Sequence, residues 1–321
     1  MISLSFILRS LAACICVLFV SCGEGVTPLM KAAKEGSTAQ IDTLLQEKAA
    51  VDEQSKYGWT ALMFACWQGH DDAVETLLEA GADPNISSST VPSSFETVAG
   101  HPPSTALQEA IRNKHTGIAK TLIKAGAKLD PASVARAGGL GDLDFLRYLK
   151  SQGADFNTPS ENAFAASALC AAASAGHSSA VRWLLANGAS PNLVAASSTA
   201  LIEAIRSDQP AIVRLLIQHG ADVNLAPGHM GESPLYIAAT KYTHERNYEN
   251  NLSIIRELLR SGADPQQKKG YSQETPLETL AIQKANTEKG LQEADNETYR
   301  SRLQQSLEHQ NTIIRLLKQQ R

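Results

Sequence analysis

The 321-residue sequence is poor in aromatic residues and has no excess of positive charge. Aromatic side chains make up 5% of its residues, which is fewer than we expect of a protein that stacks ligands between rings. The formal net charge is −4. This balance argues against a nucleic-acid-binding protein whose affinity depends on a basic surface.

The sequence also lacks the common motifs of catalysis and metal binding. It has no glycine-rich phosphate loop followed by Lys-Ser/Thr, no Gly-x-Ser-x-Gly elbow, and no His/Cys set with zinc spacing. The 8 histidines are scattered, and among them only His229 and His244 flank one predicted helix on loops. A metal or acid–base role for that pair is the one enzymatic alternative. We otherwise expect no catalytic residues, no metal and no cofactor.

A sequence pattern of about 33 residues repeats from residue 27 onward. In its clearest copy, Thr60-Ala61-Leu62-Met63-Phe64-Ala65 precedes Gly69-His70. The threonine can cap a helix, the small residues allow a neighbouring helix to approach, and the glycine can end the helix in a left-handed conformation. A second apolar stripe follows, with pairs one turn apart, as in Ile212-Val213 and Leu216-Ile217. Each unit is therefore predicted to be two short helices.

This pattern resembles the ankyrin repeat, whose first helix carries Thr-Pro-Leu-His-x-Ala. The resemblance implies an all-α fold, an ankyrin-repeat solenoid of about eight helix-turn-helix units with short β-hairpin or loop connections. Units are expected to start near residues 27, 60, 105, 132, 167, 199, 233 and 275. We assign residues 1–21 to a signal peptide, 22–26 to a linker, 27–321 to the repeat domain and 283–321 to an extended helical C-terminal cap.

Several positions depart from the family pattern. The histidine of the motif is absent from every unit, which predicts less regular turns. The fourth unit replaces Thr-Pro-Leu with Ala132-Ser133-Val134, and Gly138-Gly139 is expected to weaken its helix by roughly 1 kcal/mol per glycine. Residues 86–103 form a predicted Ser/Pro-rich insertion, and residues 241–252 a loop inside the seventh unit.

Two cysteines lie within the repeats. Cys66 and Cys170 fall in the second and fifth units. With helices stacked 8–10 Å apart they would lie about 30 Å from each other, too far for a disulfide. Both are predicted to be small buried core residues.

The N-terminus has the features of an export signal. Arg9 ends a short n-region, the stretch from Ser10 to Val20 is almost wholly apolar, and Cys22 follows. The stretch resembles a bacterial lipoprotein signal, which implies lipidation of Cys22, although Phe19 occupies a position where that family favours leucine. An ordinary cleaved signal and an uncleaved anchor are the alternatives, but the apolar run is shorter than the ~17–25 residues of a spanning helix.

The residue after the cysteine bears on where the protein would go. Gly23 instead of aspartate suggests sorting to the periplasmic face of the outer membrane if this is a Gram-negative lipoprotein. Cleavage without lipidation would leave a periplasmic or secreted protein.

The expected binding surface is the concave face that such repeats build from hairpin tips and first helices. Tyrosine and tryptophan are common interface anchors, and the second unit is rich in them. The candidate binding residues are Tyr57, Trp59, Phe64, Trp67, Gln68, Glu109, Arg112, Asn113, Glu203 and Arg206. The alternative is that Trp59 and Phe64 pack in the core beneath residues 86–103.

We therefore predict a non-enzymatic scaffold that binds a protein partner, is exported, and is anchored by lipid. Its partner would be a protein, not a nucleic acid, and only the N-terminal anchor would contact a membrane. An envelope protective factor, an immunity-type inhibitor of a toxin or enzyme, and a secreted host-directed effector are the alternatives. The fold does not distinguish among them.

Overall fold

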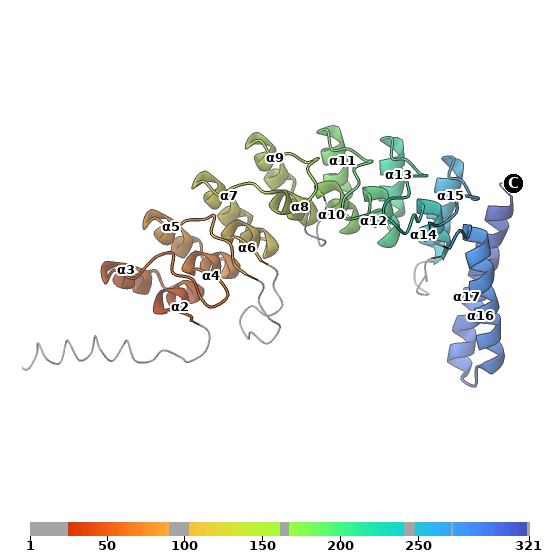
Figure 1. The fold of residues 1–321 in the computed structure, drawn as a ribbon, viewed down its shortest axis with the longest axis horizontal. Coiled ribbons are helices and arrows are strands. Elements are labelled where there is room, and N and C mark those ends of the chain that lie inside the picture. Colours follow the sequence, from red (N-terminus) through yellow and green to blue (C-terminus); the bar gives the residue numbers. More distant parts are fainter. Residues whose placement is uncertain (1–24, 90–102, 161–166, 241–247, 271, 320–321) are drawn as a thin grey trace, which may run out of the picture. The chain divides into compact units, whose positions relative to one another are not determined.

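The computed structural model describes residues 25–89, 103–160, 167–240, 248–270 and 272–319. Within these ranges every regular element is a helix, and the helices come in consecutive pairs (Figure 1). The connections hold two isolated antiparallel bridges, Ser87 with Thr105 and Ala195 with Ser198. The predicted all-α repeat fold is confirmed.

The chain divides between Leu129 and Asp130 into two compact parts, each containing several repeats, which we call unit 1 and unit 2. Unit 1 contains the helix pairs α2 (Pro28–Glu35) and α3 (Thr38–Gln46), α4 (Ala61–Gln68) and α5 (Asp71–Glu79), and α6 (Ala106–Arg112) and α7 (Thr116–Lys124). Unit 2 contains α8 (Pro131–Leu140) and α9 (Leu143–Ser151), α10 (Ala168–Ser174) and α11 (Ser178–Ala186), α12 (Ala200–Arg206) and α13 (Pro210–Gln218), α14 (Pro234–Thr240) and α15 (Tyr248–Arg260), and α16 (Pro276–Glu293) and α17 (Glu297–Lys318).

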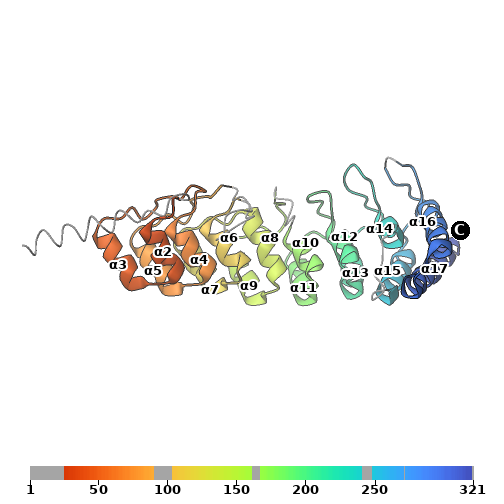
Figure 2. The same cartoon turned by 90° about the horizontal axis from the view of Figure 1, so that it is seen from below.

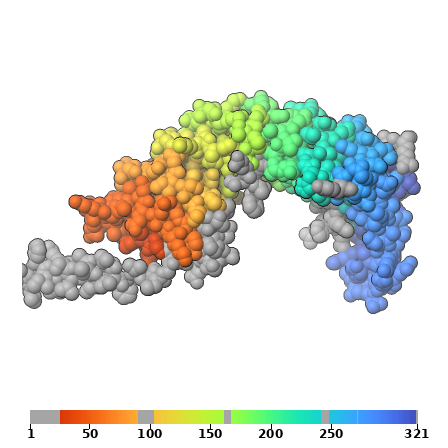
Figure 3. Space-filling view, in the orientation of Figure 1, coloured from red at the N-terminus to blue at the C-terminus, as the bar shows by residue number. Residues whose placement is uncertain are grey.

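Each unit has two layers of helices. In unit 1 the first helices α2, α4 and α6 pack side by side, and the second helices α3, α5 and α7 form the other layer. Unit 2 repeats this arrangement, with α8, α10, α12, α14 and α16 in one layer and their partners in the other (Figure 2). Side chains fill the space between neighbouring helices of a unit in the space-filling view (Figure 3). One pair alone could not bury its apolar stripe, so stability comes from each pair's contact with its neighbours.

Every first helix begins with a side-chain cap. The capping oxygen accepts a hydrogen bond from the backbone N–H three residues later, as Thr60 does from Met63 at 3.3 Å. The capping residues are Thr27, Thr60, Thr105, Asp130, Ser167, Thr199, Ser233 and Thr275. Such caps contribute about 1 kcal/mol each, and they form without the family's histidine. Although the missing histidine predicted less regular turns, the starts of the first helices are regular.

The first helix of the fourth repeat, α8, starts two residues earlier than the sequence predicted. Asp130 caps α8 by accepting from the Ser133 N–H at 2.9 Å, and Pro131 occupies the first helical turn. Asp-Pro is thus the local equivalent of Thr-Pro, and Ala132 lies inside the helix. The start near residue 132 is corrected to Asp130, because an aspartate cap followed by proline is a stronger helix start than Ala132-Ser133.

Gly138 brings α8 close to the next first helix. A Cβ atom built on Gly138 would lie 2.1 Å from the carbonyl oxygen of Ala168 and 2.6 Å from its Cα. On Gly139, by contrast, a Cβ would meet the Cβ of Ala171 at an ordinary 3.5 Å. The sequence predicted that both glycines weaken the first helix of the fourth repeat. The structure instead brings Gly138 so close to the backbone of α10 that a side chain there would force the two helices to shift.

Asparagines join successive turns in a ladder. In unit 2, Asn224 donates through Nδ2 to the Gly262 carbonyl at 3.0 Å and accepts at Oδ1 from the Asp264 N–H at 2.8 Å. The same two bonds are made by Asn85 to Gly126 and Lys128, by Asn157 to Gly188 and Ser190, and by Asn192 to Gly220 and Asp222. The short amide side chains of asparagine suit turns. They also connect neighbouring helix pairs.

We expect Asn224→Ala to lower the free energy of unfolding by about 1–2 kcal/mol, because it removes two hydrogen bonds between adjacent turns. Urea unfolding followed by circular dichroism measures the change. Asn286→Ala is the control, since Asn286 is exposed on α16 and its replacement should be close to neutral. Equal losses in the two variants would show that the ladder adds no stability.

The C-terminal pair is longer than the pairs before it. α16 has 18 residues and α17 has 22, and together they extend past the ends of α14 and α15 (Figures 1 and 3). The turn between them is closed by Asn296, which accepts from the N–H groups of Thr298 and Tyr299. The polar stretch assigned to a helical cap is therefore a helical hairpin.

A buried histidine holds α17 against α15. His309 is 8% exposed, its ring stacks on Tyr248 with centroids 4.4 Å apart, and its Nε2 lies 3.0 Å from Oδ1 of Asn251. The amide nitrogen of Asn251 already donates to the Ala238 carbonyl, so the imidazole Nε2 is the donor to Asn251. Burial lowers the pKa of His309, and the nearby Glu249 opposes this in part.

Lowering the pH is therefore expected to weaken the C-terminal pair. A depressed folded-state pKa means that the contribution of His309 is complete above its usual value of 6.5 and is lost as the pH falls toward the folded-state pKa. The free energy of unfolding of wild type should fall more between about pH 7 and pH 5 than that of His309→Gln, which cannot titrate. Identical pH dependences in urea unfolding would contradict the assignment.

Two predicted loops lie partly outside the described residues. Residues 90–102 of the insertion and 241–247 of the seventh-unit loop, with His244, are not described. Residues 248–252 belong to α15, so the loop assigned to 241–252 ends earlier than predicted. The predicted signal peptide and Cys22 also lie outside the described residues.

Candidate functional site

The aromatic residues of the second pair divide between the core and the surface. Trp59 is 0% exposed and Phe64 is 1% exposed, with ring centroids 5.0 Å apart. Trp67 is partly exposed and meets Trp59 edge to face at 6.2 Å. Trp59 and Phe64 are therefore core residues and are removed from the candidate binding surface. The buried ring of Trp59 packs against Trp67 and holds it in place.

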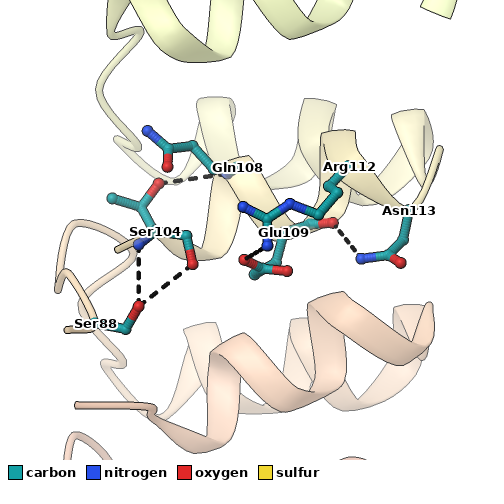
Figure 4. Close-up of polar contacts among 7 residues, drawn as sticks. Ser88, Ser104, Gln108, Glu109, Arg112 and Asn113 are labelled. Carbon is teal, nitrogen blue, oxygen red and sulfur yellow. Dashed lines mark hydrogen bonds and ion pairs between the residues drawn. The ribbon is translucent and has the colours of Figure 1, made fainter. Parts of the chain in front are cut away.

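The two ends of the insertion meet beside this cluster. The Ser88 N–H donates to the Ser104 carbonyl at 2.9 Å. In return, the Ser104 N–H donates to the Ser88 hydroxyl at 3.0 Å (Figure 4). Ser89 donates twice to the carbonyl of Tyr57, from its N–H at 2.9 Å and from its hydroxyl at 3.0 Å. Tyr57 is thereby fixed at the base of the insertion and is partly exposed.

A buried ion pair orients Arg112 on α6. Its Nη1 lies 2.7 Å from Oε1 of Glu109, whose side chain is 0% exposed, while 20% of the Arg112 side chain is exposed (Figure 4). Asn113 donates from its amide to the Glu109 carbonyl at 2.8 Å. Glu109 was predicted as a surface residue and is corrected to a buried one. Its role is to position the guanidinium of Arg112.

Unit 2 contains the same pair on α12. The helices α6 and α12 share the sequence Ala-Leu-x-Glu-Ala-Ile-Arg. Glu203 Oε1 lies 3.1 Å from Nη1 of Arg206 and accepts from the Ser198 hydroxyl at 2.6 Å. This copy is more open, with 46% of the Arg206 side chain exposed. Both candidate arginines are thus oriented by a glutamate one turn earlier.

Sequence reasoning missed one residue of the surface, Lys34. Its Nζ lies 6.0 Å from the ring centroid of Trp67, which is within cation–π range. Lys34, Trp67 and Arg112 each come seven residues after the threonine that caps their helix. Counting from the caps would have found this row. The first-helix face of unit 1 is the name we give to the exposed side chain of Gln68 together with the partly exposed side chains of Lys34, Trp67, Arg112 and Asn113.

The remaining chemistry of the described residues is structural. They hold no group of three His, Cys, Asp or Glu side chains suited to a metal ion. Cys66 and Cys170 are free and buried, as predicted. Burial raises the pKa of Cys66 well above its usual value, with smaller effects of Glu109 and Asp71, and burial raises the pKa of Cys170 to about 11. Neither thiol is a poised nucleophile at neutral pH.

Two histidines, His70 and His177, contact the preceding helix pair. His70 Nε2 lies 3.0 Å from the Lys34 carbonyl, and His177 Nε2 lies 3.0 Å from the Gly139 carbonyl. Both rings cover a glycine with positive φ, Gly36 and Gly141 respectively. These contacts account for the two histidines without catalysis.

None of the helices in the described ranges combines the length and apolar character needed to span a bilayer. The anchor expected from the sequence would depend on Cys22, which these ranges do not include.

The repeats match known proteins at the level of the fold. The family model for ankyrin repeats matches residues 5–88, 134–227 and 196–269, together more than half of the chain. The human ASB11 ankyrin repeat domain superposes with a TM-score of 0.57 over 74% of this chain and 99% of that domain, at 22% identity.

Curated relatives match over short stretches. Bovine mitochondrial disaggregase is 45% identical over 58 residues, which are 18% of this chain and 9% of that protein. Mouse ankyrin repeat and SAM domain-containing protein 6 is 45% identical over 62 residues, 19% of this chain and 7% of that protein. The chain thus spans less than a tenth of either relative. Because the ankyrin-repeat family model matches more than half of it, the chain belongs to the ankyrin-repeat family.

Proposed function

We propose that this protein is a non-enzymatic scaffold that binds a protein partner through the first-helix face of unit 1, with Tyr57 at its edge. The observation that carries the proposal is Trp67, a partly exposed indole supported by the buried ring of Trp59 and flanked by the charges of Lys34 and Arg112. Tryptophan, tyrosine and arginine dominate the binding energy of many interfaces.

Rigidity supports the same proposal. The helices α2, α4 and α6 are capped, and the ion pair to Glu109 orients Arg112 before any partner arrives. A preformed surface loses little conformational entropy on binding, so a few anchors can supply the affinity. The open pair of Glu203 and Arg206 in unit 2 is a second candidate contact.

The test compares two tryptophans with similar surroundings. Trp183 on α11 has Lys150 6.0 Å from its ring and Phe156 edge to face at 5.7 Å, so it resembles Trp67 but lies in the second-helix layer of unit 2. Trp67→Ala should abolish partner capture from an envelope fraction, and Trp183→Ala should leave it unchanged. Equal capture by Trp67→Ala, wild type and Trp183→Ala would remove the first-helix face from consideration.

Arginine 112 needs a paired substitution. Arg112→Ala alone would leave the buried carboxylate of Glu109 without its cation, so a loss of binding could reflect a loss of stability. Combining Glu109→Gln with Arg112→Gln removes both charges together. If Arg112 contacts the partner, this double variant should bind weakly while it keeps the helical content of wild type.

Export and lipid anchoring at Cys22 are part of the proposal. They rest on Arg9, the apolar stretch from Ser10 to Val20, and the cysteine that follows. Palmitate labelling of the full chain should be lost in Cys22→Ser, and the variant should leave the membrane fraction. Labelling that persists in Cys22→Ser would contradict anchoring at this residue and would leave the binding proposal intact.

A further inference from the structure

The two layers of unit 1 carry different charges. Around the first-helix face, the cationic side chains are Lys31, Lys34, Lys56 and Arg112. The acidic groups of the same segments are Glu109, which is buried and paired with Arg112, Glu35, which is exposed next to Lys34, and Glu53, which is exposed in the turn that carries Lys56. On the other layer, α5 exposes Asp71, Asp72, Glu75 and Glu79. The first-helix face is thus locally cationic in a chain whose net charge is −4.

Three side chains form a row across the first helices. Lys34, Trp67 and Arg112 occupy the same position on α2, α4 and α6, which pack in that order. Neighbouring helices pack 8–10 Å apart, which an extended peptide spans in about two to three residues. The row therefore presents a cation, an aromatic surface and a second cation along one line.

The chemistry of the row favours one kind of ligand. The Arg112 side chain remains 20% exposed, so its positive charge can attract a carboxylate, and the ammonium of Lys34 at the other end of the row attracts the same charge. The indole of Trp67 between them offers a flat apolar surface for an aliphatic or aromatic side chain. A basic segment would meet Lys34 and Arg112 as like charges, and the acid oriented toward Arg112 is buried.

We propose that the first-helix face of unit 1 binds an acidic, extended segment of the partner in which carboxylates flank an apolar side chain. The inference rests on the proposed function and adds the chemistry of the partner to it. The carboxylates would contact Lys34 and Arg112, and the apolar side chain would pack on Trp67.

Synthetic peptides test the chemistry directly. Fluorescein-labelled dodecapeptides of glycine with a central leucine, flanked by glutamate, by glutamine or by lysine, are titrated with the full repeat domain and read by fluorescence polarisation. The glutamate peptide should bind at least about tenfold more tightly than the other two. Its affinity should fall at least about tenfold in Trp67→Ala and in Lys34→Glu, and should decrease with added salt. Lys150→Glu, beside Trp183, is the matched control and should bind as wild type does.

Two outcomes would overturn the inference. One is binding of the glutamine or lysine peptide as tight as that of the glutamate peptide, or no binding of the glutamate peptide at all. The other is tighter binding of a single-stranded DNA oligonucleotide or of anionic vesicles than of the glutamate peptide, which would show a general preference for polyanions. If capture of the partner depends on Trp67 but the glutamate peptide does not compete with it, this inference fails while the proposed function stands.

Fluorescence quenching tests the local charge without any partner. The chain has 3 tryptophans, and Trp59 is 0% exposed, so Trp67 is the accessible indole in Trp183→Phe. Iodide should quench its emission more strongly than caesium, and Lys34→Glu should reduce or reverse the difference. Stronger quenching by caesium in Trp183→Phe would contradict a cationic face.

Discussion

Replacing Gly138 by alanine is expected to be among the most damaging single changes in unit 2, although it adds one methyl group to a helix. The new Cβ would lie 2.1 Å from the Ala168 carbonyl oxygen, which belongs to the backbone of the residue that starts α10 and cannot rotate away. Overpacking a tight contact costs 1–3 kcal/mol and occasionally more, and the better helix propensity of alanine returns about 1 kcal/mol. A contact this short belongs at the upper end of that cost, so we expect a net loss of about 2 kcal/mol.

Gly139 is the matched control for this prediction. It is the next residue of the same helix, and its Cβ would meet only ordinary contacts to Ala171. Gly139→Ala should therefore gain up to about 1 kcal/mol from helix propensity. Urea unfolding of the two variants should give changes of opposite sign. Similar effects in both would mean that the close approach of α8 and α10 does not determine the role of Gly138.

The second large effect is expected at Trp59. Trp59→Ala removes a side chain that is 0% exposed and contacts both Phe64 and Trp67. Large-to-small changes of this kind cost about 3–5 kcal/mol, and the lost ring contacts add to the transfer and cavity terms. We expect a loss of about 4 kcal/mol in the free energy of unfolding, measured by urea titration.

Trp67→Ala separates stability from binding. Trp67 is partly exposed, and its main contacts are the edge of Trp59 and the ammonium of Lys34. Its loss should cost less than about 2 kcal/mol, well below that of Trp59→Ala, while partner capture is lost. Equal destabilisation by the two substitutions would place Trp67 in the core and weaken the proposed function.

Local features of the fold could be predicted from the sequence. The capping residues Thr27, Thr60 and Thr275 and the left-handed glycines Gly36 and Gly69 depend on a few neighbouring residues, and the structure has them as predicted. The one shifted start, at Asp130, also follows a local rule, because Asp-Pro provides a cap and a first-turn proline. A search for repeats of Thr-Pro alone passes over it.

Features that depend on the neighbouring helix pair could not be predicted. The need for glycine at position 138 comes from the backbone of Ala168, and both side-chain bonds of each ladder asparagine go to a turn roughly a repeat away. The burial of Glu109 belongs to the same class, because α6 packs against α4 and Arg112 covers the carboxylate. Trp59 lies in the turn before α4, where helical periodicity does not indicate burial, so the sequence could not separate its role from that of Trp67.

The most direct test of the binding surface is hydroxyl-radical footprinting of the full chain with and without its captured partner. The method reads the solvent exposure of individual side chains, and tryptophan and tyrosine react readily. We expect the oxidation of Trp67 and Tyr57 to decrease in the complex while that of Trp183 stays the same. Protection of Trp183 with Trp67 and Tyr57 unchanged would place the partner elsewhere and contradict the account.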